Sequence, residues 1–286
     1  MQIAQILANG LVLGALYACL AVGFSLVWGV LNVINMLHGS FIILGGYLTF
    51  FAWRDFGIHP LVMLPPVALL TFAIGYAVQY GLVNKVVTAP VLTTLTLTFG
   101  LDMIIYNLMT VGFHATPVKV SLGLGSVSAF GVRMPVDRLM GMGLALLLTG
   151  ALYYVMRAST IGRAIVAVRM DRAAAALMGI RVNHIYAVTF GIGALMAGLA
   201  GVIFAVIFPV TTNLSGMYLG KAFVVCVIGG LGSVPGALVG GLVLGVVESF
   251  AGHFFGPAHA LTVGFLLMLA LLVVKPTGLV GVKGYE

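Results

Sequence analysis

The sequence predicts an all-α, polytopic membrane protein of about nine helices, and three observations support this fold class. The 286 residues are 62% hydrophobic and 7% charged, which leaves too few polar side chains to cover a water-soluble globule. Long apolar runs alternate with short polar breaks, as expected for helices that satisfy their own backbone in hydrocarbon. The short alternating strands of a membrane barrel are absent from the sequence. We therefore expect a single helical membrane domain over residues 1–286, with eight to ten crossings.

Seven apolar runs are each suited to one span. They cover residues 6–30, 37–53, 60–83, 89–111, 139–156, 185–208 and 258–274. An eighth run, residues 223–250, is too long for one comfortable span, and its centre at residues 229–236 reads GGLGSVPG, which breaks a helix. We expect a broken pair of half-spans here. Because such breaks place free backbone groups near transport paths, Gly230 and Gly232 are candidate path residues.

Basic residues predict the orientation, since Lys and Arg near the ends of spans are retained on the cytoplasmic side. Residues 157–184 hold five Arg and one Asp. Placing them inside puts the N-terminus outside and the C-terminus in the cytoplasm, and makes residues 112–138 an external loop that can hold a short hairpin. The basic residues expected inside are Lys85, Arg157, Arg163, Arg169, Arg172, Arg181, Lys275 and Lys283, and those expected outside are Arg54, Lys119, Arg133, Arg138 and Lys221.

Polar residues recur every third position at Asn32, Asn35 and His38. On a helix they would form one polar stripe, which Gly39 interrupts. Polar groups in a membrane cost free energy unless they are paired or face water. Two interpretations stay open: the stripe and Gly39 line a transport path, or the side chains form a network between helices in which His38 is a satisfied core residue.

Two acids lie within predicted spans. Thr94, Thr98 and Asp102 are spaced by four and share one helix face. This face is a candidate to line a transport path, and Asp102 could also be a proton or cation site. Alternatively, the Thr hydroxyls bond their own helix and the lone Asp is paired with a neighbouring helix. Glu248, near the end of the broken helix, either belongs to the transport path as part of a glycine-rich gate or is a capped, half-exposed acid.

Enzyme chemistry has little support in this sequence. It contains no His-Glu-x-x-His pair, no Gly-x-Ser-x-Gly elbow and no Cys-x-x-Cys. Residues 229–236 also lack the closing Lys-Ser or Lys-Thr pair of a phosphate loop. We therefore expect no catalytic residue, metal or cofactor in this chain, and any ATP must be hydrolysed by a partner. The scattered Lys and Arg do not indicate nucleic acid.

The segment of residues 157–184 is the sharpest feature of the sequence. Residues 161–169 read IGRAIVAVR and residues 171–180 read DRAAAALMGI. The alanine run favours a helix, with Gly179 as its C-terminal cap. Such a short amphipathic helix either receives force from a soluble partner or rests on anionic lipid.

Several motifs, taken in order, resemble the permeases of branched-chain amino acid ABC importers, and the H-type (LivH-like) subunit most closely. GRAI at 162–165, the Asp-Arg-alanine run and LMGI at 177–180 look like the coupling helix of that family. The other matching stretches are NGLVLGALYA at 9–18, WGVLNVIN at 28–35, His38-Gly39, KAF at 221–223, Glu248 and KPTGL at 275–279. Two positions differ from the family pattern, because Ser40 is often acidic there and no Glu lies near Ala173.

The resemblance implies alternating access in a bacterial or archaeal inner membrane, with branched-chain or other hydrophobic amino acids as cargo. The implied partners are membrane lipid, two ABC ATPases that bind the ATP, a second related permease and a periplasmic or extracellular solute-binding protein. Alternatives are urea, short amides or aromatic acids as cargo, or a stand-alone secondary transporter or channel that uses Asp102. The residues expected to couple to the ATPases are Gly162, Arg163, Asp171, Arg172, Leu177, Met178 and Gly179.

Overall fold

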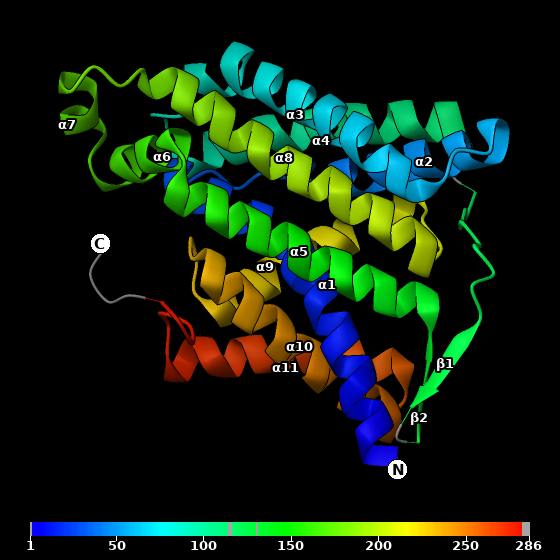
Figure 1. Ribbon diagram of the computed structural model, residues 1–286. Coiled ribbons are helices and arrows are strands. Elements are labelled where there is room, and N and C mark those ends of the chain that lie inside the picture. Colours follow the sequence, from blue (N-terminus) through cyan, green and yellow to red (C-terminus); the bar gives the residue numbers. More distant parts are fainter. Residues whose placement is uncertain (1, 114–115, 130, 282–286) are drawn as a thin grey trace.

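The computed structural model describes residues 2–113, 116–129 and 131–281, which are mostly helical (Figure 1). Short 3₁₀ turns and one strand pair connect the helices. The helices are α1 (Gln2–Leu31), α2 (Leu37–Phe56), α3 (Leu64–Gly81), α4 (Val91–Phe113), α5 (Val136–Ala158), α6 (Thr160–Met170), α7 (Arg172–Leu177), α8 (Val182–Ile207), α9 (Ser215–Gly229), α10 (Val234–Phe254) and α11 (Pro257–Val274). The smaller elements are η1 (Pro60–Met63), η2 (Val83–Lys85), η3 (Thr212–Leu214), β1 (Ser126–Ala129) and β2 (Val132–Pro135).

The number of membrane-crossing helices agrees with the sequence. Within the described residues, eight helical segments are long and apolar enough to cross a membrane, and they include α1, α3, α4, α5, α8, α9, α10 and α11. The remaining long helix, α2, has 20 residues, enough for about 30 Å. It carries polar residues such as His38 and Arg54. The prediction of an all-α bundle with eight to ten crossings is therefore confirmed.

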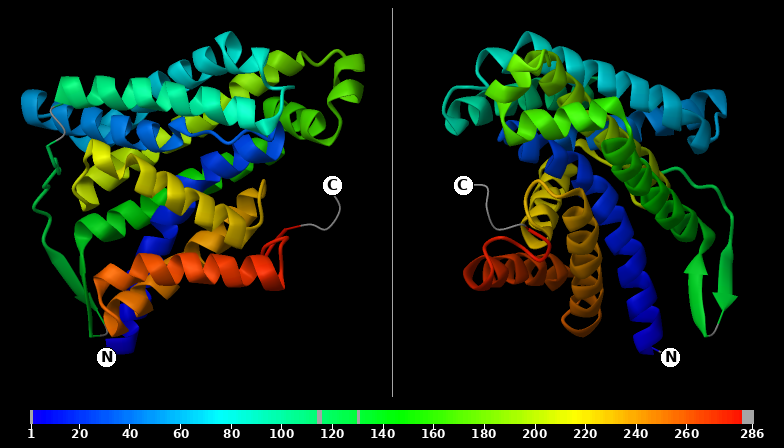
Figure 2. Two further views of the ribbon diagram at one scale, coloured as in Figure 1. Left: turned by 180° about the vertical axis from the view of Figure 1, so that it is seen from behind. Right: turned by 60° about the vertical axis from the view of Figure 1, so that its left-hand side comes forward.

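Two helices form the centre of the bundle. The most apolar stretches of α1 and α8 are each 89% buried, whereas those of α3, α4, α5 and α11 are 11–22% buried. α1 packs on α5, α8, α9 and α10, and α8 packs on α2 and α3. Figures 1 and 2 accordingly show α2, α3, α4 and α8 on one side of α1, with α9, α10 and α11 on the other. The outer helices expose apolar side chains, as lipid contact requires.

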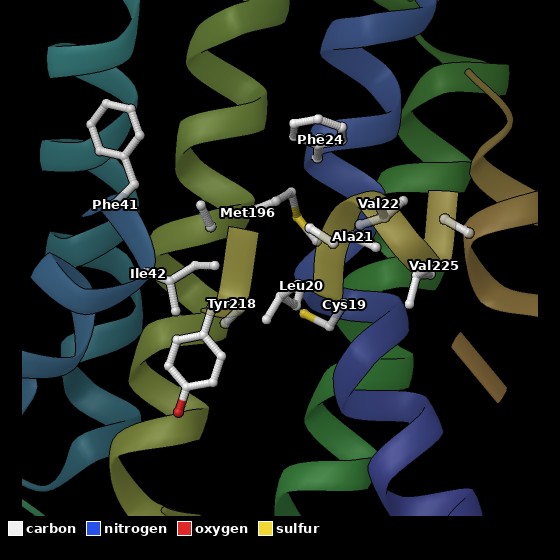
Figure 3. Close-up of a cluster of buried hydrophobic side chains, with 14 of the residues drawn as sticks. Cys19, Leu20, Ala21, Val22, Phe24, Phe41, Ile42, Met196, Tyr218 and Val225 are labelled. Carbon is white, nitrogen blue, oxygen red and sulfur yellow. The ribbon is translucent and has the colours of Figure 1, made fainter. Parts of the chain in front are cut away.

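Close helix contacts depend on glycine. A Cβ on Gly201 would overlap the carbonyl oxygen of Ile42 in α2, and a Cβ on Gly245 of α10 would overlap the backbone of Gly14 in α1. Small residues at such crossings allow the backbones to approach. Larger side chains fill the space where α1, α2, α8 and α9 meet (Figure 3), among them Leu20, Phe24, Phe41, Ile42, Met196, Tyr218 and Val225.

The two ends of the bundle differ. One end, which we call the α6–α7 end, carries the short helices at the left of Figure 1, and the opposite, hairpin end carries β1 and β2. The antiparallel hairpin pairs Ser126 with Pro135 and lies within residues 112–138, as predicted. It is attached to α1 by Gln5, whose amide donates to the carbonyl of Arg133 (3.0 Å) and accepts from its backbone N–H (2.8 Å).

The predicted helix break is present within residues 229–236, but the helices on either side of it are longer than predicted. α9 ends at Gly229 and α10 begins at Val234, with positive φ angles at Gly230 (107°) and Gly232 (77°). The expectation of two half-spans was wrong, since each of the two helical segments is long enough to cross. The turn between them lies at the α6–α7 end. α9 also begins at Ser215, eight residues before the predicted start, so Lys221 lies inside a span and not in an outer loop.

Candidate functional site

A buried ion pair joins α9 and α10. Lys221 Nζ lies 2.9 Å from Glu248 Oε2, and the side chains of these residues are only 12% and 6% exposed. Tyr17 of α1 completes the group, because its hydroxyl donates to Glu248 Oε2 (2.6 Å) and accepts from Lys221 Nζ (2.5 Å). Glu248 is therefore not the half-exposed, capped acid that the sequence allowed. We call Tyr17, Lys221 and Glu248 the charged triad.

Helix packing positions the charged triad. The glycine-rich contact between α1 and α10 brings Tyr17 beside Glu248. The tight turn after α9 places α10 alongside α9, and this brings Glu248 close to Lys221. Removing two charges from water costs several kcal/mol each, so the pair persists only because each charge has its partner and Tyr17 adds a hydrogen bond. Sequence reasoning missed Tyr17 and Lys221. The available signal was a Lys in an apolar run 27 residues before an isolated intramembrane Glu.

A pocket of about 320 Å³ adjoins the charged triad. Its walls come from the end of α8, the link to α9 and the first turns of α9, all towards the hairpin end of the bundle. Lys221 is the one charged residue among those that line it in the described part of the chain. The lining residues are Tyr17, Phe204, Phe208, Pro209, Leu214, Met217, Tyr218 and Lys221. The pocket thus combines an aromatic and apolar wall with one ammonium group.

Asn32, Asn35 and His38 do not form the predicted stripe on a helix. α1 ends at Leu31, and residues 32–36 are a non-helical link in which Asn32 has a positive φ of 53°. Asn32 is exposed, whereas Asn35 is buried and its amide has no hydrogen-bond partner among the described residues. His38 is buried in α2, with Nε2 2.7 Å from the carbonyl oxygen of Leu20. The link exists because a sharp return from α1 to α2 is incompatible with continuous helix.

Gly39 also differs from its expected role. It lies inside α2 and does not interrupt the helix. A Cβ at this position would overlap the backbone of Ser215, the first residue of α9. Gly39 therefore allows close packing between α2 and α9.

The predicted shared face of α4 is confirmed. Thr94, Thr98 and Asp102 are buried, whereas most of α4 is exposed. Thr94 donates to its own helix at Val91, as the alternative interpretation expected. Thr98 Oγ1 donates to the carbonyl of Ile34 in the α1–α2 link (2.9 Å).

Asp102 is bound within the same contact. Its Oδ1 accepts a hydrogen bond of 2.5 Å from Ser40 of α2. Ser40 Oγ lies 3.3 Å from Ser215 Oγ at the start of α9. These bonds connect three helices, and a role of this face in lining a transport path stays a prediction.

The turn with Gly230 and Gly232 is held by two segments. Arg169 of α6 donates from Nη1 to the carbonyl oxygen of Gly232 (2.8 Å). On the other side, the backbone N–H groups of Leu279 and Val280 donate to the carbonyls of Ile228 (2.9 Å) and Gly229 (3.0 Å). The two glycines therefore connect α6 with α9 and α10, and they lie apart from the charged triad.

Local capping builds the α6–α7 segment. Ser159 Oγ accepts from the N–H of Gly162 (2.9 Å) and begins α6. Asp171 Oδ1 accepts from the N–H groups of Ala173 (2.8 Å) and Ala174 (3.0 Å), so it caps α7. At the other end of α7, Gly179 has a φ of 83°, and the structure confirms that it ends the helix.

The tip of this segment is apolar and uncovered. Leu177 and Met178 are 89% and 83% exposed. Arg163 and Arg172 are also exposed, whereas Gly162 packs against the backbone of Met156 in α5. Exposed apolar side chains beside basic ones indicate an interaction surface for protein or lipid.

Comparison with known proteins identifies the family. The family model described as the permease component of the branched-chain amino acid transport system matches residues 6–274. The high-affinity branched-chain amino acid transport permease BraD of Pseudomonas aeruginosa is 32% identical, over 97% of this chain and 95% of BraD. LivH of Escherichia coli is 31% identical over the same shares. LivM of Salmonella typhimurium is 26% identical, over 92% of this chain and 67% of LivM.

No solved structure matches the chain significantly. The family match nevertheless covers nearly the whole bundle, from α1 to the end of α11. The chain therefore belongs to the branched-chain amino acid transport permeases, the inner-membrane subunits of ABC importers that are not themselves enzymes.

Proposed function

We propose that this chain forms the membrane path of an ATP-driven importer for branched-chain or other hydrophobic amino acids. It works by alternating access with two ATPases on the α6–α7 end, a second related permease beside it and a solute-binding protein at the hairpin end. ATP binds to the ATPases. The names of BraD and LivH support the cargo class, and the match to LivM supports the second permease.

The distribution of charge supports an orientation with the α6–α7 end in the cytoplasm. Among the described residues outside the bundle core, seven basic residues and one acid lie at the α6–α7 end, against four basic residues and two acids at the hairpin end. Lys283 lies outside the described residues. The first group is Lys85, Arg157, Arg163, Arg169, Arg172, Arg181, Lys275 and Asp171, and the second is Arg54, Lys119, Arg133, Arg138, Asp55 and Asp137. Residues 112–138 are then external and residues 157–184 are cytoplasmic.

The contact between Arg169 and Gly232 is the observation that supports this function most directly. Leu177 and Met178 offer an apolar surface to an ATPase, and Arg169 on the adjoining helix binds the turn that joins α9 to α10. A displacement of α6 by the ATPases therefore acts directly on two spanning helices. ATP can shift the equilibrium between the inward and outward states only if the closed ATPases interact differently with each state. The contact between Arg169 and Gly232 connects the ATPases to the spanning helices.

Transport by the reconstituted complex tests the proposal. The tagged chain would be coexpressed with the proposed ATPases and second permease, purified and placed in proteoliposomes with ATP enclosed on the α6–α7 side. We expect ATPases to copurify and labelled leucine uptake to require both ATP and the binding protein. Uptake that needs no ATPases, follows a proton gradient and is lost in Asp102→Asn would contradict this proposal. Such a result would indicate a secondary transporter.

A further inference from the structure

The charged triad is more elaborate than helix packing requires. Hydrophobic residues could fill the same space, and replacing a buried ion pair by such residues is often neutral or stabilising. Ionisable groups inside membrane proteins usually mark a substrate or ion path. Lys221 and Glu248 therefore need an explanation beyond stability.

The geometry leaves the ammonium group available to a ligand. Lys221 carries three N–H donors, of which the structure uses two, to Tyr17 and Glu248, with no third partner among the described residues. The same side chain lines the pocket of about 320 Å³, whereas Glu248 lies behind it and is not part of the lining. A molecule in the pocket would meet the positive charge first and the negative charge next.

The shape of the pocket complements this polarity. Phe204 and Tyr218 pack edge to face with ring centroids 5.0 Å apart and form part of the wall, which Phe208 and Met217 extend. Aromatic and thioether groups favour branched apolar side chains. The pocket lies towards the hairpin end, where the proposed binding protein would deliver its cargo.

From these contacts we infer that the charged triad is a transit site for a zwitterionic amino acid, which is bound by exchange of ion-pair partners. This inference rests on the proposed function and assigns its substrate-contacting residues. The carboxylate of the cargo takes the Lys221 ammonium, its ammonium takes the Glu248 carboxylate, and its side chain occupies the apolar wall. Charge is balanced before and after, because one ion pair opens and two form. Tyr17 bonds to both residues and positions them.

Coupling to the α6–α7 end follows from the same helices. Lys221 lies on α9 and Glu248 on α10, and the turn between these helices is the one that Arg169 binds. A movement of that turn changes the separation of the two charges. When they close on each other, the cargo loses both ionic contacts and is released.

A double substitution distinguishes a cargo-binding role of the charged triad from a role in helix packing alone. Lys221→Met with Glu248→Leu removes both charges and leaves no unpaired charge, only the neutral Tyr17 hydroxyl without its two partners, so the complex should assemble and hydrolyse ATP in response to the binding protein. We expect leucine uptake to fall by at least about tenfold, because the cargo loses both of its ionic contacts with the chain and such buried contacts usually contribute at least this factor in affinity. Uptake within about twofold of the parent complex would overturn the inference. Absence of uptake by the parent complex would instead refute the proposed function.

A second variant tests the pocket even where the double substitution fails to assemble. Met217→Trp narrows the apolar wall at a residue that is 37% exposed. We expect it to reduce leucine uptake more than alanine uptake. Met103→Trp on α4, at a residue 39% exposed and outside the pocket lining, is the matched control. An unchanged ratio of leucine to alanine uptake in Met217→Trp would contradict the assigned pocket.

Discussion

Replacing the apolar tip of the α6–α7 segment, Leu177→Asp with Met178→Asp, should detach the ATPases while leaving the permease intact. Both side chains are more than four-fifths exposed in the free chain, so the substitutions should change its stability by no more than about 0.5 kcal/mol. Burying each side chain in an interface contributes about 1.5–3 kcal/mol. Losing both therefore removes roughly 3–6 kcal/mol, or about two to four orders of magnitude in affinity.

The assay is copurification of the ATPases with the tagged permease, together with ATP-driven uptake. We expect both to be lost while the amount of permease in the membrane is unchanged. Leu124→Asp with Val127→Asp provides the matched control, because these residues are 46% and 51% exposed near the hairpin, and they should leave copurification intact. Retained copurification in the Leu177 and Met178 variant would show that the tip rests on lipid, and the coupling role of the segment would have to be withdrawn.

Three further outcomes follow from the structure. Ala174→Cys should be labelled only from the cytoplasm and Ser126→Cys only from outside, with little background because both native cysteines are buried; the reverse pattern would invert the topology. Asp171→Ala should weaken α7 by about 1 kcal/mol and reduce uptake, whereas Asp171→Asn keeps the cap and the activity; equal loss in both would indicate an ion pair with the ATPase. Gly232→Ala should lower the melting temperature and uptake, because its φ is 77° and a Cβ would lie 2.7 Å from α1 backbone; Gly143→Ala, with open space around it, serves as the control and should do neither.

Hydropathy and local capping were sufficient to predict most of the helices. Seven of the predicted spans match observed helices within a few residues, because a helix in hydrocarbon must be continuous and apolar whatever its neighbours are. The buried face of α4 follows from the spacing of Thr94, Thr98 and Asp102, since residues four apart lie above one another on a helix. The end of α7 at Gly179 is equally local, because a left-handed residue at that position favours glycine.

Interpretation of single polar residues was less successful when it depended on their neighbours. The spacing of Asn32, Asn35 and His38 suggested a helical stripe, but the chain reverses direction there, and the reversal depends on how α2 packs against α8 and α9. The glycine run at residues 229–236 correctly indicated a break. Its depth could not be inferred, because that depends on where the helix before it begins.

By itself, the sequence determined that this is a helical membrane bundle of the branched-chain amino acid permease type, since apolar length and ordered motifs are properties of the chain alone. Only the tertiary structure decided that Lys221 lies inside a span, paired with Glu248 and Tyr17. A hydropathy pattern treats an isolated charge as the end of a helix. The charge can enter the membrane only when a partner neutralises it, and here the partners lie 27 and 204 residues away along the chain. Their proximity arises from the packing of α1, α9 and α10, which no local pattern encodes.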